Sequence, residues 1–142
     1  MALNASSAVP RGSETILIVE PDPETRALAV FMLSRLGYRV LEARTAVDAV
    51  KIYAEQPERV HLLFTETLMS KVNGHELAQM LTRENPDLRV LYLADAGYER
   101  LTRKVAQQRA LCFLRRPFTM RMLASKVREV LDVPAARVLG AA

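Results

Sequence analysis

The chain has 142 residues, a length that suits one domain with a single core and leaves no room for a second domain. Half of its residues are hydrophobic and a quarter are charged, which excludes a disordered or repetitive chain, and no apolar run is long enough to cross a bilayer. The single cysteine, Cys112, excludes an internal disulfide. Because no secretion signal is recognisable, we expect a cytoplasmic protein that makes no contact with membranes.

The two ends of the chain lack the hydrophobic period of a helix or a strand. Residues 1–13 are small and polar, and their Val-Pro-Arg-Gly-Ser ending resembles the protease-site remnant of an expression tag, so we expect this segment to be disordered. Residues 134–142 are expected to form a flexible tail. The folded domain is therefore expected to cover residues 14–133.

Within the expected domain, short apolar runs alternate with longer amphipathic segments. Residues 16–19 form the first apolar run, and their lack of polar alternation is typical of a strand that is covered on both faces. Asp22 and Pro23 then offer an N-cap and a first helical residue, and Gly37 offers a helix end. Helical spacing predicts that the apolar face of this helix consists of Leu28, Phe31, Met32 and Leu36.

The same cycle repeats four more times along the chain. The other strands are expected over residues 38–42, 62–65, 90–94 and 111–114. The other helices are expected from Thr45 to about Gln56, after Asn73-Gly74, over about 99–108, and after Pro117. This alternation predicts an α/β fold of the flavodoxin-like, doubly wound (βα)5 type, with a five-stranded parallel sheet of order 2-1-3-4-5.

In such a sheet, the loops at the carboxyl ends of the strands converge on one crevice, which is the usual place for a functional site. The sequence places the following residues there: Glu20, Pro21 and Asp22 after the first strand, Glu66 after the third, Ala94 at the end of the fourth, and Arg116 after the fifth.

Three segments at these strand ends resemble a response-regulator receiver domain: LIVEPDPETR (17–26), LLFTETLMSKVNGHEL (62–77) and FLRRPF (113–118). The resemblance covers about residues 14–131 and implies a role in two-component signal transduction. Receivers accept a phosphoryl group from a histidine kinase onto an aspartate. They use Mg²⁺, an acidic pair, a Ser or Thr and a lysine for this step.

Each of these chemical positions is changed in this chain. Glu66 stands where the resemblance implies the phosphate-accepting aspartate, and its extra methylene displaces the carboxylate. Glu20 and Pro21 stand where it implies the acidic pair, and proline has no metal ligand to offer, although Asp22 could substitute in part. Because Mg²⁺ demands near-ideal oxygen geometry, we expect weak or absent Mg²⁺ binding, no metal site and no other cofactor.

The positions that respond to phosphorylation are changed as well. Ala94 stands at the Ser/Thr position, and Phe113 stands at the switch aromatic, where simple core packing is the plainer role. Arg116 replaces the lysine and can hold Glu66 through two parallel hydrogen bonds, either as an on-like lock or as a structural pair. The resemblance also implies a cis peptide bond between Arg116 and Pro117.

We therefore interpret the chain as an atypical receiver domain that is not an enzyme, has no catalytic residues and acts through protein contacts. The expected partner is a histidine kinase, a phosphotransfer protein, an effector or a second copy of the chain. Two alternatives stay open: a phosphorylatable receiver that uses Glu66 or Asp22, either stand-alone or part of a hybrid histidine kinase, and a basic nucleic-acid-binding module.

The charge distribution bears on the partner. Residues 98–128 carry 9 Lys and Arg residues against Glu99 alone. We expect a partner surface formed by the helix over 99–108, the strand over 111–114 and the last helix, with three cations at its centre: Arg100, Arg103 and Lys104. The absence of Trp and the scarcity of aromatic residues argue against nucleic-acid binding.

Overall fold

The computed structural model describes residues 8–56, 59–67, 73–94 and 113–133, and the structural statements that follow concern these ranges. One five-stranded sheet has the order β2-β1-β3-β4-β5, and each neighbouring pair is parallel. This order confirms the predicted flavodoxin-like α/β fold. The strands are β1 (Thr15–Val19), β2 (Arg39–Ala43), β3 (Leu62–Glu66), β4 (Arg89–Ala94) and β5 (Phe113–Arg115). The helices are α2 (Pro23–Arg35), α3 (Ala46–Glu55), α4 (Gly74–Glu84) and α6 (Met120–Asp132).

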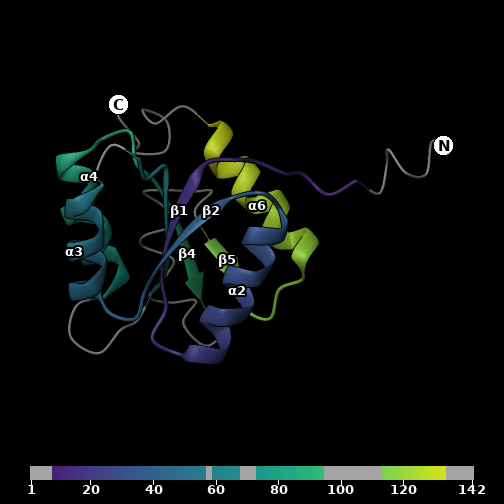
Figure 1. Cartoon of the computed structure of the whole chain (residues 1–142), viewed down its shortest axis with the longest axis horizontal. Helices are drawn as coiled ribbons and strands as arrows, with labels where there is room; N and C mark the ends of the chain where they lie inside the picture. Colours follow the sequence, from purple (N-terminus) through teal and green to yellow (C-terminus); the bar gives the residue numbers. More distant parts are fainter. Residues whose placement is uncertain (1–7, 57–58, 68–72, 95–112, 134–142) are drawn as a thin grey trace.

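Helices cover both faces of the sheet, with α3 and α4 on one side and α2 and α6 on the other (Figure 1). Alternate residues of β1 therefore enter two separate cores. Leu17 and Val19 pack with residues of α3 and α4, whereas Ile16 and Ile18 pack with residues of α2 and α6. All four side chains are buried, which explains why this strand lacks the usual alternation with polar residues.

The predicted helix starts are confirmed by their capping hydrogen bonds. The Asp22 side chain accepts from the Thr25 N–H at 2.8 Å, and the Thr45 hydroxyl accepts from the Asp48 N–H at 3.1 Å. The Asn73 side chain caps α4 in the same way. These bonds satisfy N–H groups that have no partner inside the helix. Each of these three helices therefore begins at a capping residue that follows a strand.

The buried face of α2 differs from the predicted one. Leu28 and Phe31 are 50% and 59% exposed, whereas Ala29 and Leu33 are fully buried against the sheet. Leu36, just beyond the helix, is buried as predicted. Apolar residues surround most of this helix, so spacing alone cannot select a face, and close packing against the sheet favours the side that carries the small Ala29.

The last residues of the segment expected to be disordered lie against the domain. Val9 packs on the core between α2, α6 and the sheet, and the Gly12 N–H donates to the Leu36 carbonyl at 3.1 Å. Gly37 has a φ of 102°, and a Cβ there would collide with the carbonyl oxygen of Gly12. Gly37, the predicted helix end, thus also leaves room for the main chain of Gly12.

Several predicted features lie outside the described residues. They are residues 1–7, the helix expected over 99–108 with Arg100, Arg103 and Lys104, the residue Cys112, and the tail expected over 134–142. None of the helices in the described ranges combines the length and the apolar character that crossing a bilayer would require.

Candidate functional site

Three charged side chains meet at the carboxyl ends of the strands. Glu20 follows β1, Glu66 ends β3, and Arg116 follows β5. The Glu20 N–H donates to the Ala43 carbonyl and the Arg116 N–H donates to the Ala94 carbonyl, so sheet-like bonds fix both residues beyond their strands. Glu20 and Glu66 are only 3% and 6% exposed. The topology therefore brings two buried carboxylates together with one guanidinium.

The Arg116 guanidinium bridges the two carboxylates. Its Nη1 donates to Glu20 Oε1 at 3.1 Å, and its Nη2 forms an ion pair with Glu66 Oε2. The structure thus contains the ion pair between Glu66 and Arg116 that the sequence suggested, and it adds Glu20, which sequence reasoning had not paired with the arginine. The peptide bond between Arg116 and Pro117 is cis, as the resemblance implied.

The remaining carboxylate oxygens accept hydrogen bonds from the main chain. Glu20 Oε2 accepts from the Asp22 N–H at 2.9 Å, and Glu66 Oε1 accepts from the Thr67 N–H at 3.0 Å. Each of the four oxygens therefore has a donor. Buried charges are tolerated when they are paired and hydrogen-bonded in this way, so the cluster forms a closed network.

The Asp22 carboxylate caps a helix and makes no hydrogen bond to Arg116 among the described contacts. It accepts from both the N–H and the hydroxyl of Thr25, at 2.8 and 2.7 Å, and thereby caps α2. The Thr25 hydroxyl is the main reason why the pKa of Asp22 lies below its usual value. The residue is exposed, and its capping position does not supply the extra crevice ligand that the sequence had left open.

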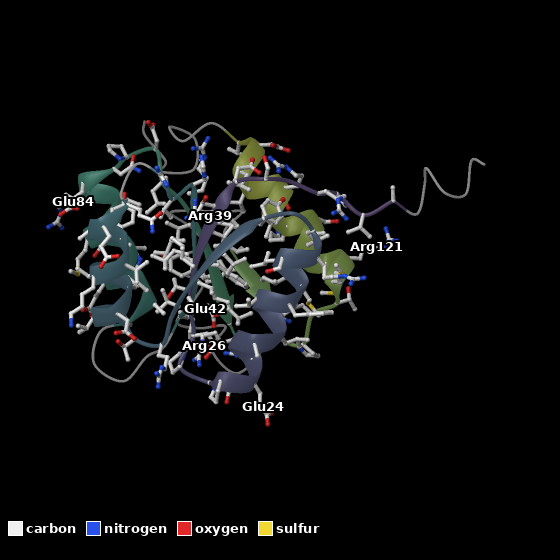
Figure 2. The ribbon with its side chains drawn as sticks, in the orientation of Figure 1. Glu24, Arg26, Arg39, Glu42, Glu84 and Arg121 are labelled. Carbon is white, nitrogen blue, oxygen red and sulfur yellow. The ribbon has the colours of Figure 1, made fainter. Side chains whose placement is uncertain are left out.

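Arg26 fixes the loop between β1 and α2, a role that sequence reasoning missed. Its Nη1 donates to the Glu20 carbonyl at 2.7 Å, and its Nε lies 3.5 Å from Glu42 Oε1 on β2. Figure 2 shows Arg26 and Glu42 close together beside the start of α2. Because Arg26 binds a main-chain oxygen across a turn, no residue pattern in the sequence signals the contact.

Gly74 lets α4 begin directly against the end of β3. A Cβ at this position would collide with the Glu66 carbonyl oxygen, and the Gly74 N–H donates to the Thr67 carbonyl at 2.9 Å. Only glycine permits so close an approach of the two backbones. The Asn-Gly pair thus places the start of α4 beside Glu66.

The residues at the two positions that the resemblance assigns to the phosphorylation response pack with the interior. Ala94 is buried and offers no hydroxyl. Phe113 is half-buried, and its ring stacks on Tyr92 of β4 with a centroid distance of 5.3 Å. The Tyr92 hydroxyl lies 3.3 Å from Nδ1 of His75 on α4, so the aromatic contact extends to a second helix. These contacts agree with a core role for Phe113.

The crevice residues do not fit the Mg²⁺ ion that the resemblance implies. Mg²⁺ needs near-octahedral oxygen ligands at short distances. Here the Glu20 and Glu66 carboxylates are both bound to Arg116, Pro21 has no ligand atom, and Asp22 caps a helix. An ion at this place would compete with the guanidinium for the same carboxylate oxygens, so these side chains as they lie do not fit Mg²⁺.

The chain is similar to known proteins over most of its length. The family model for the response regulator receiver domain matches residues 16–128. The sensor kinase CckA of Brucella abortus is 29% identical over 121 residues, which are 85% of this chain but only 13% of that protein. The response regulator receiver protein CpdR of the same organism is 28% identical over 116 residues, covering 82% of this chain and 95% of CpdR.

Solved structures show the same fold. A response regulator receiver domain protein from Clostridium thermocellum superposes with a TM-score of 0.77 at 20% identity, covering 84% of this chain and 94% of that one. The receiver domain of the hybrid histidine kinase CckA superposes with a TM-score of 0.69 at 24% identity, covering 83% of this chain and 99% of that one.

Proposed function

Because the chain belongs to the response regulator receiver domain family, we propose that it is an atypical receiver of two-component signalling whose crevice is filled by its own Arg116. In this proposal the chain does not undergo the normal phosphorylation cycle, has no catalytic activity of its own, and acts through contacts with other proteins. The observation that carries the proposal is the bridge from one guanidinium to two buried carboxylates, Glu20 and Glu66.

The chemistry of phosphoryl transfer supports this proposal. Transfer depends on a positioned nucleophile and on cationic groups that stabilise the charge of the transferred group. Both oxygens of Glu66 already accept hydrogen bonds, one from Arg116 and one from the Thr67 N–H. The guanidinium is bound to the carboxylates, and Ala94 cannot donate a hydrogen bond to an incoming phosphoryl group.

The direct test is incubation of the chain with Mg²⁺ and acetyl phosphate, followed by intact-mass measurement. We expect the mass to stay unchanged. A stoichiometric gain of one phosphoryl group would overturn the proposal and favour the alternative in which the chain is a phosphorylatable receiver.

A reconstructed variant is the matched positive control. Four substitutions restore the residue types implied by the resemblance: Pro21→Asp, Glu66→Asp, Ala94→Thr and Arg116→Lys. We expect this variant to gain one phosphoryl group under the same conditions, because it regains an acidic pair, an aspartate, a hydroxyl and a lysine. If the variant folds but stays unmodified, these four positions do not account for the lost chemistry.

The partner surface is a separate part of the proposal. We place it on the basic segment that contains Arg100, Arg103 and Lys104, together with β5 and α6, and its partner is a kinase, a phosphotransfer protein, an effector or a second copy. Exchanging the three cations for Glu should abolish partner capture or self-association without unfolding the domain. Exchanging Arg35, Arg39 and Arg83 for Glu gives the same charge change elsewhere on the surface. Equal binding by the two triple variants would show that the proposed face is wrong.

A further inference from the structure

The outward side of α2 carries an apolar stripe that no described element covers. Leu28 and Phe31 are 50% and 59% exposed, and the small residues Ala27 and Ser34 beside them are exposed as well. Single exposed apolar side chains are common, but neighbouring ones on one side of a helix form a patch that indicates a contact surface. α2 thus has one apolar side that packs on the sheet and a second one that faces outward (Figure 1).

Two opposite charges lie at the two ends of this stripe. Glu24 lies in the first turn of α2 and Arg35 in the last turn, and both are exposed. Together with Leu28 and Phe31 they are spaced by four, three and four residues, which places all four on one side of the helix, as in a helix–helix seam. Figure 2 shows the Glu24 side chain pointing away from the domain.

Neither of these charges belongs to an ion pair among the described residues. The Arg35 guanidinium lies 5.7 Å from the centroid of the Phe31 ring, so it extends along the stripe toward the apolar residues. Both charges are therefore available to a partner that lies along α2.

The stripe is complementary to itself when two copies of α2 lie antiparallel. In a parallel pair, each charge would face the same charge of the other copy. In an antiparallel pair related by a twofold axis, Glu24 of one copy faces Arg35 of the other at both ends of the contact. The same register sets Leu28 of one copy against Phe31 of the other, because both pairs are centred on the same point of the helix. The dipoles of antiparallel helices also attract each other.

We propose that the outward side of α2 binds a second copy of this chain, in a twofold dimer whose two α2 helices are antiparallel. A helix of 13 residues is about 20 Å long and about 10 Å wide, a footprint well below the roughly 800 Å² per partner that stable interfaces bury. The dimer is therefore weak and forms at high protein concentration. The contact is separate from the crevice and from the basic segment, so its failure would leave the proposed function unaffected.

The test is sedimentation of the full chain over a range of concentrations, together with charge variants of α2. Glu24→Arg and Arg35→Glu should each weaken self-association about tenfold, because the twofold axis turns each substitution into two contacts between like charges. An equimolar mixture of the two single variants should associate at least as well as the wild-type chain, because every charge then faces an opposite one. A purely structural effect of either substitution on α2 would not be reversed by mixing.

The matched control makes the same charge changes in α4, with Glu76→Arg in its first turn and Arg83→Glu in its last turn. Both control variants should sediment like the wild-type chain. Phe31→Ser removes the apolar centre of the stripe and should weaken association about tenfold or more, while the unfolding transition of the monomer stays unchanged because the side chain is exposed.

Three outcomes would overturn the proposal. A chain that stays monomeric at every concentration would leave the stripe to a helix of another protein. A mixture of Glu24→Arg and Arg35→Glu chains that associates no better than either variant alone would exclude the antiparallel pairing. Association that is lost when Arg100, Arg103 and Lys104 are exchanged for Glu, but kept in the α2 variants, would place the second copy on the basic segment.

Discussion

Arg116 holds two acidic side chains together in a place that water barely reaches. Its own side chain is 22% exposed, whereas those of Glu20 and Glu66 are 3% and 8% exposed. A buried ion pair need not add net stability over an apolar pair, but a buried charge that loses its partner is strongly destabilising. The arginine is therefore required mainly because the two carboxylates are there.

Replacing Arg116 by Met tests this dependence. The substitution leaves both carboxylates buried without a cation, and we expect it to lower the free energy of unfolding by about 3–5 kcal/mol. Urea unfolding followed by circular dichroism at neutral pH measures the change.

The control for this prediction removes the charges as well. A triple variant with Arg116→Met, Glu20→Gln and Glu66→Gln should recover most of the lost stability, because no uncompensated charge remains. If the single variant is as stable as the wild-type chain, the network contributes nothing that depends on charge pairing.

Part of this network could be predicted from the sequence. The resemblance placed Glu66 and Arg116 in one crevice, and their complementary charges suggested the pair. The participation of Glu20 in the network could not be predicted, because it depends on the direction in which the Arg116 guanidinium extends between two strands. Asp22 had two possible roles in the sequence, as a helix cap and as a crevice ligand, and its single side chain adopts the cap.

At the scale of single elements, α2 shows where periodicity fails. Its apolar residues lie on nearly every side, so half of the predicted stripe was wrong: Leu28 and Phe31 are exposed, and Ala29 and Leu33 are buried in their place. The other two predicted residues, Met32 and Leu36, do pack with the core. By contrast, the caps of α2 and α3 could be predicted, because a cap depends on a local hydrogen bond between residues three apart.

The two faces of α2 should respond differently to substitution. Leu33→Ala creates a cavity under the helix and should cost about 2–5 kcal/mol, whereas Leu28→Ser on the exposed side should change stability by less than about 0.5 kcal/mol. Thermal and urea unfolding of the two variants provide the comparison. Similar losses in both would mean that Leu28 packs against the domain in solution.

At the scale of the whole molecule, the order of the strands could be predicted, since alternating strands and helices with crossover connections leave few arrangements. The contacts that join the two ends of the domain could not be predicted. Arg128 of α6 donates to Glu14 before β1, to the Tyr38 hydroxyl and to the Arg11 carbonyl, and it pairs with Asp132. The contacts of Arg128 with Glu14, Tyr38 and Arg11 join residues 114, 90 and 117 positions apart, beyond the reach of any local pattern.

The contact between Arg128 and Glu14 makes the stability of the domain depend on pH. The hydrogen bond from Arg128 lowers the pKa of Glu14 from 4.5 to about 2. A carboxylate with a depressed pKa contributes its full stabilisation above the unfolded-state value of 4.5 and loses it as the pH falls toward 2. Because about a quarter of each side chain faces water, we expect screening to reduce the contribution to about 1 kcal/mol.

Glu14→Gln should therefore destabilise the chain by about 1 kcal/mol at neutral pH, and the difference from the wild-type chain should shrink as the pH falls from 4.5 toward 2. Urea unfolding across this range measures it. Asp132→Asn removes the other carboxylate that is paired with Arg128. The control is Glu55→Gln at an exposed residue, which should neither lower the stability at neutral pH nor change its dependence on pH. A difference that stays constant down to the lowest pH would show that Glu14 contributes packing and not charge.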